Sequence, residues 1–434
     1  MSAWTWIVYL IPLAFAWVWQ VGRRRRIAAA SRSARRQAQS AGAAEPVSLH
    51  PAINAGLCVG CNECIKACPE RDSHVLGLID GKAELINPGD CIGHGACRAS
   101  CPVGAIKLVF GTSSRGVDIP VLSPDFETNV PGIFVAGELG GMGLIRNALV
   151  QGIEAVEAIA RHRQRRQGML DILIVGAGPA GFAASLTAMS LGLKYVTVEQ
   201  ESLGGCVFQY PRAKLVMTSS VDVPLIGKVK ITQTCKEELL NYWRNVEQKT
   251  GVAIRYKERV DSITRRAGGF LVRTTQGQHA ASSVLLAIGR RGTPRKLGVP
   301  GEDLSKVVYR LIDPAQYSGQ RVLVVGGGDS AVEAATTIAA AADAKVAISY
   351  RGGNFFRVKA KNLEQLAAAR QSGRLHVVLK SRVRQIAAQT VVVEQRGKLL
   401  RIPNEAVIIA AGGRLPTEFL KGVGVQVQTK YGTA

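Results

Sequence analysis

The first long hydrophobic stretch of the chain runs from Trp4 to Val21, and only Thr5 and Gln20 within it are polar. Its length is about that of the hydrocarbon core of a bilayer. Tryptophans stand near both ends, as in interfacial aromatic belts, and arginines follow directly. A signal peptide carries its positive charges before the apolar stretch, not after it. The pattern therefore predicts a transmembrane helix in residues 1–22, spanning the inner membrane once, with the remaining chain cytoplasmic.

Residues 23–47 have no apolar period and consist mainly of alanine, serine, arginine and glutamine. Such a composition favours a basic, flexible linker. Its position next to the apolar stretch favours contact with anionic lipid headgroups of the inner leaflet. The basic residues are Arg23, Arg24, Arg25, Arg26, Arg32, Arg35 and Arg36.

Further along, a short apolar strand at Asp171–Val175 leads into the loop Gly176–Gly181 and then a helix of small residues. In a G-x-G-x-x-G loop the first glycine allows the turn, the second lets the backbone approach a pyrophosphate, and the third lets helix and strand pack. The next strand, Tyr195–Val198, ends in Glu199, at the spacing of a carboxylate that binds a ribose hydroxyl. This region predicts a Rossmann-like dinucleotide site.

A second unit of the same kind begins with the strand Arg321–Val325, followed by the loop Gly326–Glu333. Its next strand, Lys345–Ser349, ends without an acid, and Arg351 and Arg357 follow. An acid there favours a free ribose 2′-hydroxyl, whereas arginines accommodate a 2′-phosphate. The second site therefore favours NADPH over NADH, unless both arginines simply face solvent.

Seven of the nine cysteines fall into two runs of similar spacing. Each run ends in Cys-Pro, and the spacing C-x2-C-x2-C-x3-C-P is typical of [4Fe–4S] ligation, with the last cysteine of each run ligating the other cluster. A zinc ribbon needs only two C-x2-C pairs and explains neither the third spacing nor the prolines. The predicted ligands are Cys58, Cys61, Cys64 and Cys68 in the first run, and Cys91, His94, Cys97 and Cys101 in the second.

His94 stands where the second run should have its second cysteine. As a neutral imidazole ligand it would remove one negative charge from the cluster shell and raise the reduction potential of that cluster. Alternatively the position is unligated, giving a [3Fe–4S] cluster or an exchangeable iron, or His94 lies on the loop surface. The sequence leaves these alternatives open.

The formal charge of +23 suggests nucleic acid as a partner, but the chain has no recognition-helix or RNA-binding signature. We therefore expect no nucleic-acid partner. Cysteines grouped for metal binding fit a reducing compartment. Outside the two runs only Cys206 and Cys235 remain, and no pattern pairs them.

These motifs resemble the thioredoxin-reductase-like branch of the two-dinucleotide-domain flavoproteins. The resemblance rests on both glycine loops and on three further stretches that the family shares. These are Leu203-Gly204-Gly205, Ala287-Ile288-Gly289 and the strand Ala406–Ala410 with the residues up to Leu420. The family ends with a flavin-binding segment of the form T-x-V-P-G-I-F-x-A-G-D, which here is found upstream as Thr128–Glu138. We infer a circular permutation, which predicts that Val117 and Ala434 are spatial neighbours.

The resemblance implies the cofactors FAD and NADP, or NAD, and assigns residues to both. Arg212 or Lys214 would stabilise the reduced flavin, or else be solvated surface charges. We expect no catalytic side chain beyond the flavin. The residues expected at FAD are Gly137, Glu138, Arg146, Asn147, Ala148, Gly176, Gly178, Pro179, Ala180, Gly181, Glu199, Gly205, Arg212 and Lys214. Those expected at NAD(P) are Gly326, Gly328, Asp329, Ser330, Ala331, Arg351 and Arg357.

One departure from the family concerns its disulfide. Relatives that reduce thioredoxin carry a C-x-x-C pair before the second glycine loop, but no cysteine follows Cys235 here. That disulfide relay therefore cannot operate. Cys206 is either a lone thiol near the flavin or a small buried residue.

The expected fold class is α/β, with two Rossmann-like domains, a small α+β ferredoxin domain and one N-terminal transmembrane helix. The predicted segments are 1–22 (anchor), 23–47 (linker), 48–112 (two-cluster ferredoxin domain), 113–170 (relocated return segment), 171–295 (FAD), 296–410 (NAD(P)) and 411–434 (return to the FAD domain).

The expected function is a membrane-tethered oxidoreductase that moves electrons between NAD(P)H, FAD, two iron–sulfur clusters and an external partner. A ferredoxin, a cytochrome or a quinone would fit as that partner. A homodimer is possible, but the sequence does not decide the oligomeric state. The alternatives are a redox sensor or docking protein at the membrane, and a disulfide or persulfide reductase that uses Cys206.

Overall fold

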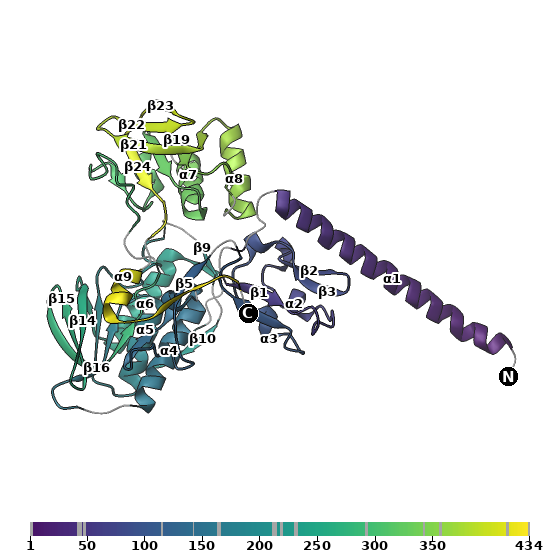
Figure 1. Ribbon diagram of the computed structural model, residues 1–434, viewed down its shortest axis with the longest axis horizontal. Helices are drawn as coiled ribbons and strands as arrows, with labels where there is room; N and C mark the ends of the chain where they lie inside the picture. Colours follow the sequence, from purple (N-terminus) through teal and green to yellow (C-terminus); the bar gives the residue numbers. More distant parts are fainter. Residues whose placement is uncertain are drawn as a thin grey trace. The chain divides into compact units, whose positions relative to one another are not determined.

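The computed structural model (Figure 1) describes most of the 434 residues. The described ranges are 3–40, 46, 49–113, 116–141, 143–162, 166–210, 215–217, 220–229, 233–290, 294–341, 343–355, 358–413 and 416–432. The chain forms two compact units. The first comprises Met1–Gly116, Asn354–Leu363 and Lys430–Ala434, and the second comprises Val117–Gly353 and Glu364–Thr429. The finer division into seven segments stays a prediction.

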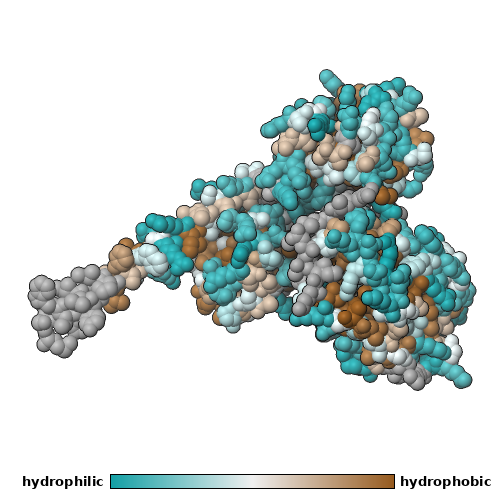
Figure 2. All heavy atoms as spheres, turned by 180° about the vertical axis from the view of Figure 1, so that it is seen from behind, coloured by the Kyte–Doolittle hydropathy of each residue, from teal (hydrophilic) through white to brown (hydrophobic). Residues whose placement is uncertain are grey.

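Helix α1 (Ala3–Ser40) corrects both N-terminal predictions. Within the part of the chain that the structure describes, no helix is long and apolar enough to cross a membrane, so the transmembrane anchor and the inner-membrane localisation are wrong. The apolar stretch is not an element of its own, because it continues without a break into the arginine-rich half of the same helix. In Figure 2 brown residues of α1 adjoin teal ones along this helix.

The predicted flexible linker is also helical as far as Ser40. Alanine, arginine and glutamine are strong helix formers, so the absence of an apolar period did not mean the absence of a helix. Its second half also has contacts to hold it, because Arg35 donates to Glu84 at 2.7 Å and Ala38 is buried.

The rest of the first unit is a small α+β domain. Strands β1 (His50–Ile53) and β4 (Ile106–Val109) pair antiparallel, and β2 (Leu76–Ile79) and β3 (Lys82–Leu85) form a hairpin. Four short helices carry the loops: α2 (Glu63–Lys66), η1 (Arg71–Ser73), η2 (Pro88–Asp90) and α3 (Ala96–Ala99). Asn62 and Gly95, with φ of 72° and 85°, precede α2 and α3, so each cysteine run has the same local turn and helix.

The second unit contains two main sheets, one mixed and one parallel, which fits the two predicted Rossmann-like domains. The first has seven strands among the described residues, in the order β13-β8-β7-β16-β15-β14, with β6 paired to β16. Its strands are β6 (Ile133–Val135), β7 (Leu170–Val175), β8 (Tyr195–Glu199), β13 (Ile254–Tyr256), β14 (Val260–Arg266), β15 (Gly269–Thr274) and β16 (Gly277–Leu286).

Strand β6 comes from the relocated segment and lies parallel to β16, with Phe134 opposite Leu285. All three residues of β6 are buried. Strand β5 (Val117–Pro120) pairs with β25 (Val427–Lys430), so the two ends of the flavoprotein part meet. This is the neighbourhood that the permutation predicts, although Ala434 itself lies outside the described residues.

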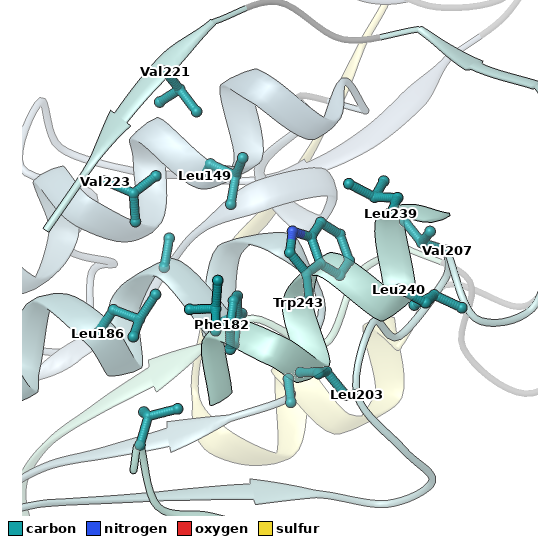
Figure 3. Close-up of a cluster of buried hydrophobic side chains, with 14 residues drawn as sticks. Leu149, Phe182, Leu186, Leu203, Val207, Val221, Val223, Leu239, Leu240 and Trp243 are labelled. Carbon is teal, nitrogen blue, oxygen red and sulfur yellow. The ribbon is translucent and has the colours of Figure 1, made fainter. Parts of the chain in front are cut away.

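Three helices pack around the first sheet: α4 (Ile145–Arg161), α5 (Pro179–Ser190) and α6 (Lys236–Thr250). Helix α4 approaches α5 closely, because a Cβ atom on Gly152 would lie 2.1 Å from the carbonyl oxygen of Ala180. Figure 3 shows Trp243 of α6 facing Phe182 of α5, with ring centroids 6.0 Å apart. Trp243 is 3 % exposed, so it packs in the core.

The second sheet has five described strands in the order β17-β24-β18-β19-β20. They are β17 (Val307–Val308), β18 (Arg321–Val325), β19 (Lys345–Tyr350), β20 (Leu375–Leu379) and β24 (Ala406–Ile409). Beside it are η4 (Pro314–Tyr317), α7 (Asp329–Ala341), α8 (Ala360–Gln371) and the antiparallel strands β21 (Ser381–Ile386), β22 (Thr390–Gln395) and β23 (Lys398–Pro403).

The remaining elements are short and belong to the second unit. Strand β9 (Leu215–Met217) pairs with β12 (Gln233–Cys235), and β10 (Val221–Val223) pairs with β11 (Gly227–Val229). Helices η3 (Gly137–Gly140) and α9 (Thr417–Val423) complete the set. Buried Leu420 of α9 joins the core of the first sheet, so the carboxyl-terminal residues return to that domain.

Candidate functional site

Four cysteines from both runs surround a small hollow in the first unit. They are Cys58, Cys61, Cys64 and Cys101, with Val59, Gly60, Asn62, Ala83, Val103, Ala105 and Ile106 as further lining residues. Three belong to the first run and one ends the second, which is the exchange of ligands that a two-cluster fold requires. Soft thiolates around a hollow fit an iron–sulfur cluster. We call this set the first cysteine site.

The thiols of the first cysteine site are close enough to influence one another. Burial, together with smaller contributions from the nearby Cys97, Cys58, Cys61 and Cys101, raises the pKa of Cys64 to about 11. A cationic cluster would reverse this effect, because metal ligation deprotonates the thiol. Two backbone groups already point at sulfur: Ala83 N–H donates to Cys58 Sγ at 3.4 Å, and Ala105 N–H donates to Cys101 Sγ at 3.3 Å.

The second cysteine site consists of Cys68, Cys91 and Cys97. Burial raises the pKa of all three thiols, that of Cys91 to about 11. Cys68 contributes to the raised pKa of both Cys91 and Cys97, which places the last cysteine of the first run with the second run. The carboxylate of Glu70 also raises the pKa of Cys68 and Cys91.

His94 has an exposed side chain on the loop between Cys91 and Cys97. Its role as a ligand therefore stays a prediction, and the three alternatives remain open. Within the described residues, no three or more His, Cys, Asp or Glu side chains converge on the position of a single metal ion. The first cysteine site is therefore a hollow between thiols and not the site of a single metal ion.

The first glycine loop is packed so closely that larger residues do not fit. A Cβ atom on Gly181 would lie 1.7 Å from the carbonyl oxygen of Gly176. A Cβ atom on Gly176, whose φ is 102°, would lie 2.6 Å from the carbonyl oxygen of Ala287. Gly178 and Gly205 face each other, since a Cβ on Gly205 would lie 3.0 Å from Gly178 Cα. Two facing glycines make a backbone cradle that a dinucleotide pyrophosphate fits.

Glu199 ends strand β8 beside this loop and is 6 % exposed. Its carboxylate accepts the backbone N–H of Ala177 at 2.7 Å and that of Glu201 at 2.8 Å. Burial raises the pKa of the Glu199 carboxyl, and the two N–H groups partly oppose this. The carboxylate is thus held at the loop, in the position from which a ribose hydroxyl is bound in this fold.

The relocated segment brings Gly137 and Glu138 to the same loop. Gly137 N–H donates to Gln151 Oε1 at 2.8 Å, and a Cβ on Gly137 would lie 2.9 Å from that of Ala180. The Cys206 thiol lies 3.6 Å from Glu138 Oε2. Two predicted FAD residues and the unassigned Cys206 therefore occur together at the start of α5.

Arg290 is a residue that the sequence analysis missed. Its Nη2 donates to the carbonyl oxygen of Asp118 at 2.9 Å, and Asp118 Oδ1 accepts from Thr429 Oγ1 at 2.7 Å. Burial lowers the pKa of the Arg290 guanidinium, and the carboxylates of Glu138 and Asp118 oppose this. An arginine after a strand carries no sequence signal for such a position. The pairing of strands β5 and β25 brings Asp118 and Thr429 together beside Arg290.

The other predicted FAD residues differ in position and exposure. Arg146 is exposed on the first turn of α4 and donates to the carbonyl oxygen of Ser220 at 3.3 Å. Asn147 follows it, and Ala148 is buried in the core between α4 and the sheet. Pro179 begins α5 as its first residue. Arg212 and Lys214 lie outside the described residues.

The second glycine loop is covered by an aromatic ring. A Cβ atom on Gly327 would lie 2.1 Å from the ring of Tyr350, whereas a Cβ on Gly328 would meet nothing within 4 Å. Gly326, with φ of 154°, lies against the carbonyl oxygen of Ala410 and the side chain of Ala331. An open Gly328 beside the first turn of α7 fits the approach of a pyrophosphate.

The remaining NAD(P) residues follow the predicted positions along the chain. Asp329 and Ser330 begin helix α7, and Ala331 is buried. Arg351 is exposed after the end of β19, and Arg357 lies outside the described residues. The missed residue here is Tyr350, which stands where other Rossmann units carry an acid.

Comparison with known proteins decides the family. Residues 173–433 match the family described as pyridine nucleotide-disulphide oxidoreductase, and residues 50–102 match the 4Fe-4S dicluster domain. The chain belongs to the pyridine nucleotide-disulphide oxidoreductases. The predicted resemblance is therefore confirmed, including the fused two-cluster domain.

Two curated relatives and one solved structure illustrate the similarity of this pyridine nucleotide-disulphide oxidoreductase. A ferredoxin–NADP reductase of Ignicoccus hospitalis is 32 % identical over 60 % of this chain and 83 % of its own length. The bacilliredoxin reductase Bdr of Bacillus subtilis is 26 % identical over 60 % of this chain and 82 % of its own. The structure of bacillithiol disulfide reductase Bdr from Staphylococcus aureus covers 59 % of this chain and 80 % of its own, with a TM-score of 0.52 and 28 % identity.

These matches establish the enzyme class and the cofactors. The chain is an NAD(P)H-dependent flavin oxidoreductase with FAD, a nicotinamide dinucleotide and iron–sulfur clusters. The roles of individual residues at these cofactors stay predictions.

Proposed function

We propose that this oxidoreductase passes electrons between NADPH and a one-electron partner of the ferredoxin type, by way of FAD and both iron–sulfur clusters. The observation that supports it most is the interleaving of the two cysteine runs, in which Cys101 joins Cys58, Cys61 and Cys64. Two clusters on the chain of a flavoprotein give a path for single electrons. FAD supplies the chemistry that joins two-electron and one-electron transfer. The ferredoxin–NADP reductase among the relatives agrees with this direction.

The protein's own groups hold the cofactors and shape their surroundings. Glu199 would bind a ribose hydroxyl of FAD, while Gly178 and Gly205 let the backbone approach its pyrophosphate. Glu138 would contact the ribityl chain, since it ends the relocated segment at the loop. No acid–base side chain is assigned to the transfer. Lipid contact and dimer formation have no support in the fold or in the relatives.

The preference for NADPH follows from what stands at the end of β19. Tyr350 and the exposed Arg351 occupy the position where NADH-binding units carry an acid. A guanidinium can pair with a 2′-phosphate, and a neutral ring does not repel it.

The experiment is anaerobic titration of the holoenzyme with NADPH and, separately, with NADH. Flavin bleaching is followed optically, and cluster reduction is followed by EPR. We expect NADPH to reduce the flavin and at least one cluster. The reduced enzyme should then reduce an acidic [2Fe–2S] ferredoxin added as a probe. Flavin reduction without any cluster signal, in protein with full iron content, would overturn the proposed path.

A second candidate is reduction of a disulfide or persulfide by Cys206. It is favoured by the 3.6 Å contact between Cys206 Sγ and Glu138 Oε2, and by the bacillithiol disulfide reductase among similar structures. The test is Cys206→Ser, with Cys235→Ser as the matched control. Unchanged ferredoxin reduction in Cys206→Ser would remove the thiol from the main path, whereas loss of a low-molecular-weight disulfide reductase activity in this variant alone would support the second candidate.

A further inference from the structure

The β2–β3 hairpin places a cation and a hydrogen-bond donor at one cysteine of the first site. Lys82 Nζ donates to the carbonyl oxygen of Cys58 at 2.5 Å, and the next residue, Ala83, donates its N–H to Cys58 Sγ at 3.4 Å. Cys58 is 8 % exposed and Ala83 is 4 % exposed. Water therefore screens the contact between Ala83 N–H and Cys58 Sγ little, and the Lys82 contact is half-buried.

Helix α1 holds the hairpin in this position. Arg35 pairs with Glu84 at 2.7 Å, and Arg32 pairs with Asp80 at the hairpin turn. Between them, a Cβ atom on Gly77 would lie 2.6 Å from Ser31 Oγ, so helix and hairpin are in close contact. Ser31, Arg35 and Ala38 share one face of the helix, which is the spacing of a packed helical surface.

We propose that Lys82 is a positioning residue that raises the reduction potential of the first iron–sulfur cluster. A cluster becomes more negative when it is reduced, so a nearby ammonium group and an N–H donor to sulfur stabilise the reduced form. This inference rests on the proposed function only in that the first cluster carries electrons.

The test is an EPR-monitored redox titration with chemical mediators and dithionite, which needs neither NADPH nor a protein partner. In Lys82→Met we expect the ratio of reduced to oxidised first cluster at a fixed potential to fall about tenfold, equivalent to a shift of about 59 mV for one electron. The second cluster should not shift. Lys82→Arg should restore most of the potential, because it keeps the charge.

The matched control is Lys107→Met on β4. Lys107 is exposed and follows Ile106, which lines the same hollow, but its side chain makes no hydrogen bond to a cysteine among the described residues. An equal shift in Lys82→Met and Lys107→Met would overturn the proposal, because the effect would then be one of net charge alone. No shift in Lys82→Met, with full iron content and a normal circular dichroism spectrum, would overturn it as well.

A double variant tests whether helix α1 supports the hairpin. Arg35→Ala combined with Arg32→Ala should lower the potential of the first cluster by less than Lys82→Met does, because the hairpin loses its support but keeps its charge. Failure of NADPH to reduce the first cluster would contradict the proposed function, whereas the potentials measured with dithionite would still test the role of Lys82.

Discussion

The two glycine loops of the second unit share a strand, a turn and a helix, yet differ in what meets them. At the first loop a buried carboxylate, Glu199, accepts two backbone N–H groups, and two glycines face each other. At the second loop Tyr350 lies against Gly327 and no carboxylate ends the strand. A Cβ atom on the second glycine of this loop motif, Gly328, would meet nothing within 4 Å.

The difference shows how one fold serves two dinucleotides. The parallel strand and the helix start provide a site for pyrophosphate in both units. The residue at the end of the next strand then decides which ribose is accepted. One or two side chains at the strand end therefore decide which dinucleotide each loop binds. Substituting these side chains should change cofactor affinity without preventing the domain from folding.

The largest effect is expected from Gly181→Val. A Cβ at this position would lie 1.7 Å from Gly176 O, so helix and strand must separate, at a cost of more than about 3 kcal/mol. We expect purified protein without FAD and with a lower unfolding temperature. Gly328→Ala at the second loop is the matched change and should leave FAD content intact. Full flavin occupancy in Gly181→Val would contradict the packing argument.

A smaller effect is expected from Glu199→Gln. The variant keeps the shape of the side chain but loses the negative charge and one of the two oxygens that accept the N–H groups. Hydrogen bonds to charged groups contribute about 1.5–3 kcal/mol. FAD affinity, measured by fluorescence titration of the apoprotein, should fall about tenfold to hundredfold. Because burial raises the pKa of Glu199, the apoprotein loses stability as pH rises through this pKa, and Glu199→Gln should lack that loss. An unaltered affinity would show that the ribose is bound elsewhere.

Exchanging the strand ends sharpens the comparison further. Arg351→Gln should raise KM for NADPH about tenfold, because a charge-assisted hydrogen bond to the 2′-phosphate is lost, while KM for NADH stays unchanged. Tyr350→Glu should lower KM for NADH, since it gives the second loop the carboxylate that the first loop has. Steady-state kinetics with both cofactors provides the measurement. Equal changes for NADPH and NADH in Arg351→Gln would place this side chain away from the phosphate.

The smallest effect concerns the ion pair that starts the second sheet. Arg321 of β18 pairs with Glu405, whose pKa falls from its ordinary value of 4.5 to about 2 through hydrogen bonds with Arg321. A lowered carboxyl pKa contributes stability above the unfolded-state value, and this is lost as pH falls from about 4.5 toward about 2. Glu405→Gln should therefore show a weaker fall in unfolding temperature on acidification. The exposed pair limits the difference to a small one, and an identical acid profile would exclude any contribution.

Much of this site could be predicted because its chemistry depends on spacing. The cysteine runs and the two glycine loops fix ligand and turn geometry over a few residues, so Cys58 and Gly181 were recognisable without the structure. The relocated Thr128–Glu138 was recognisable because it carries a complete family motif. The pairing of β6 with β16 agrees with it.

Residues that act through tertiary contact gave no such signal. Lys82, Tyr350 and Arg290 become relevant only when a hairpin, a ring or a strand pair brings them to a site. The N-terminal error has a related cause. The apolar stretch and the arginines were treated as two separate segments, whereas helix α1 continues through both because their residues are helix formers.

The position of β6 in the chain has a consequence for the order of synthesis. All seven described strands of the first sheet lie between Ile133 and Leu286, and the second sheet begins only with β17 at Val307. In the related flavoproteins the segment equivalent to β6 closes the chain, so that sheet waits for the last residues to leave the ribosome. Here its strands all emerge before the second sheet begins, and domains generally fold in the order in which they emerge. Permutation therefore allows the flavin domain to assemble its sheet while the nicotinamide domain is still being translated.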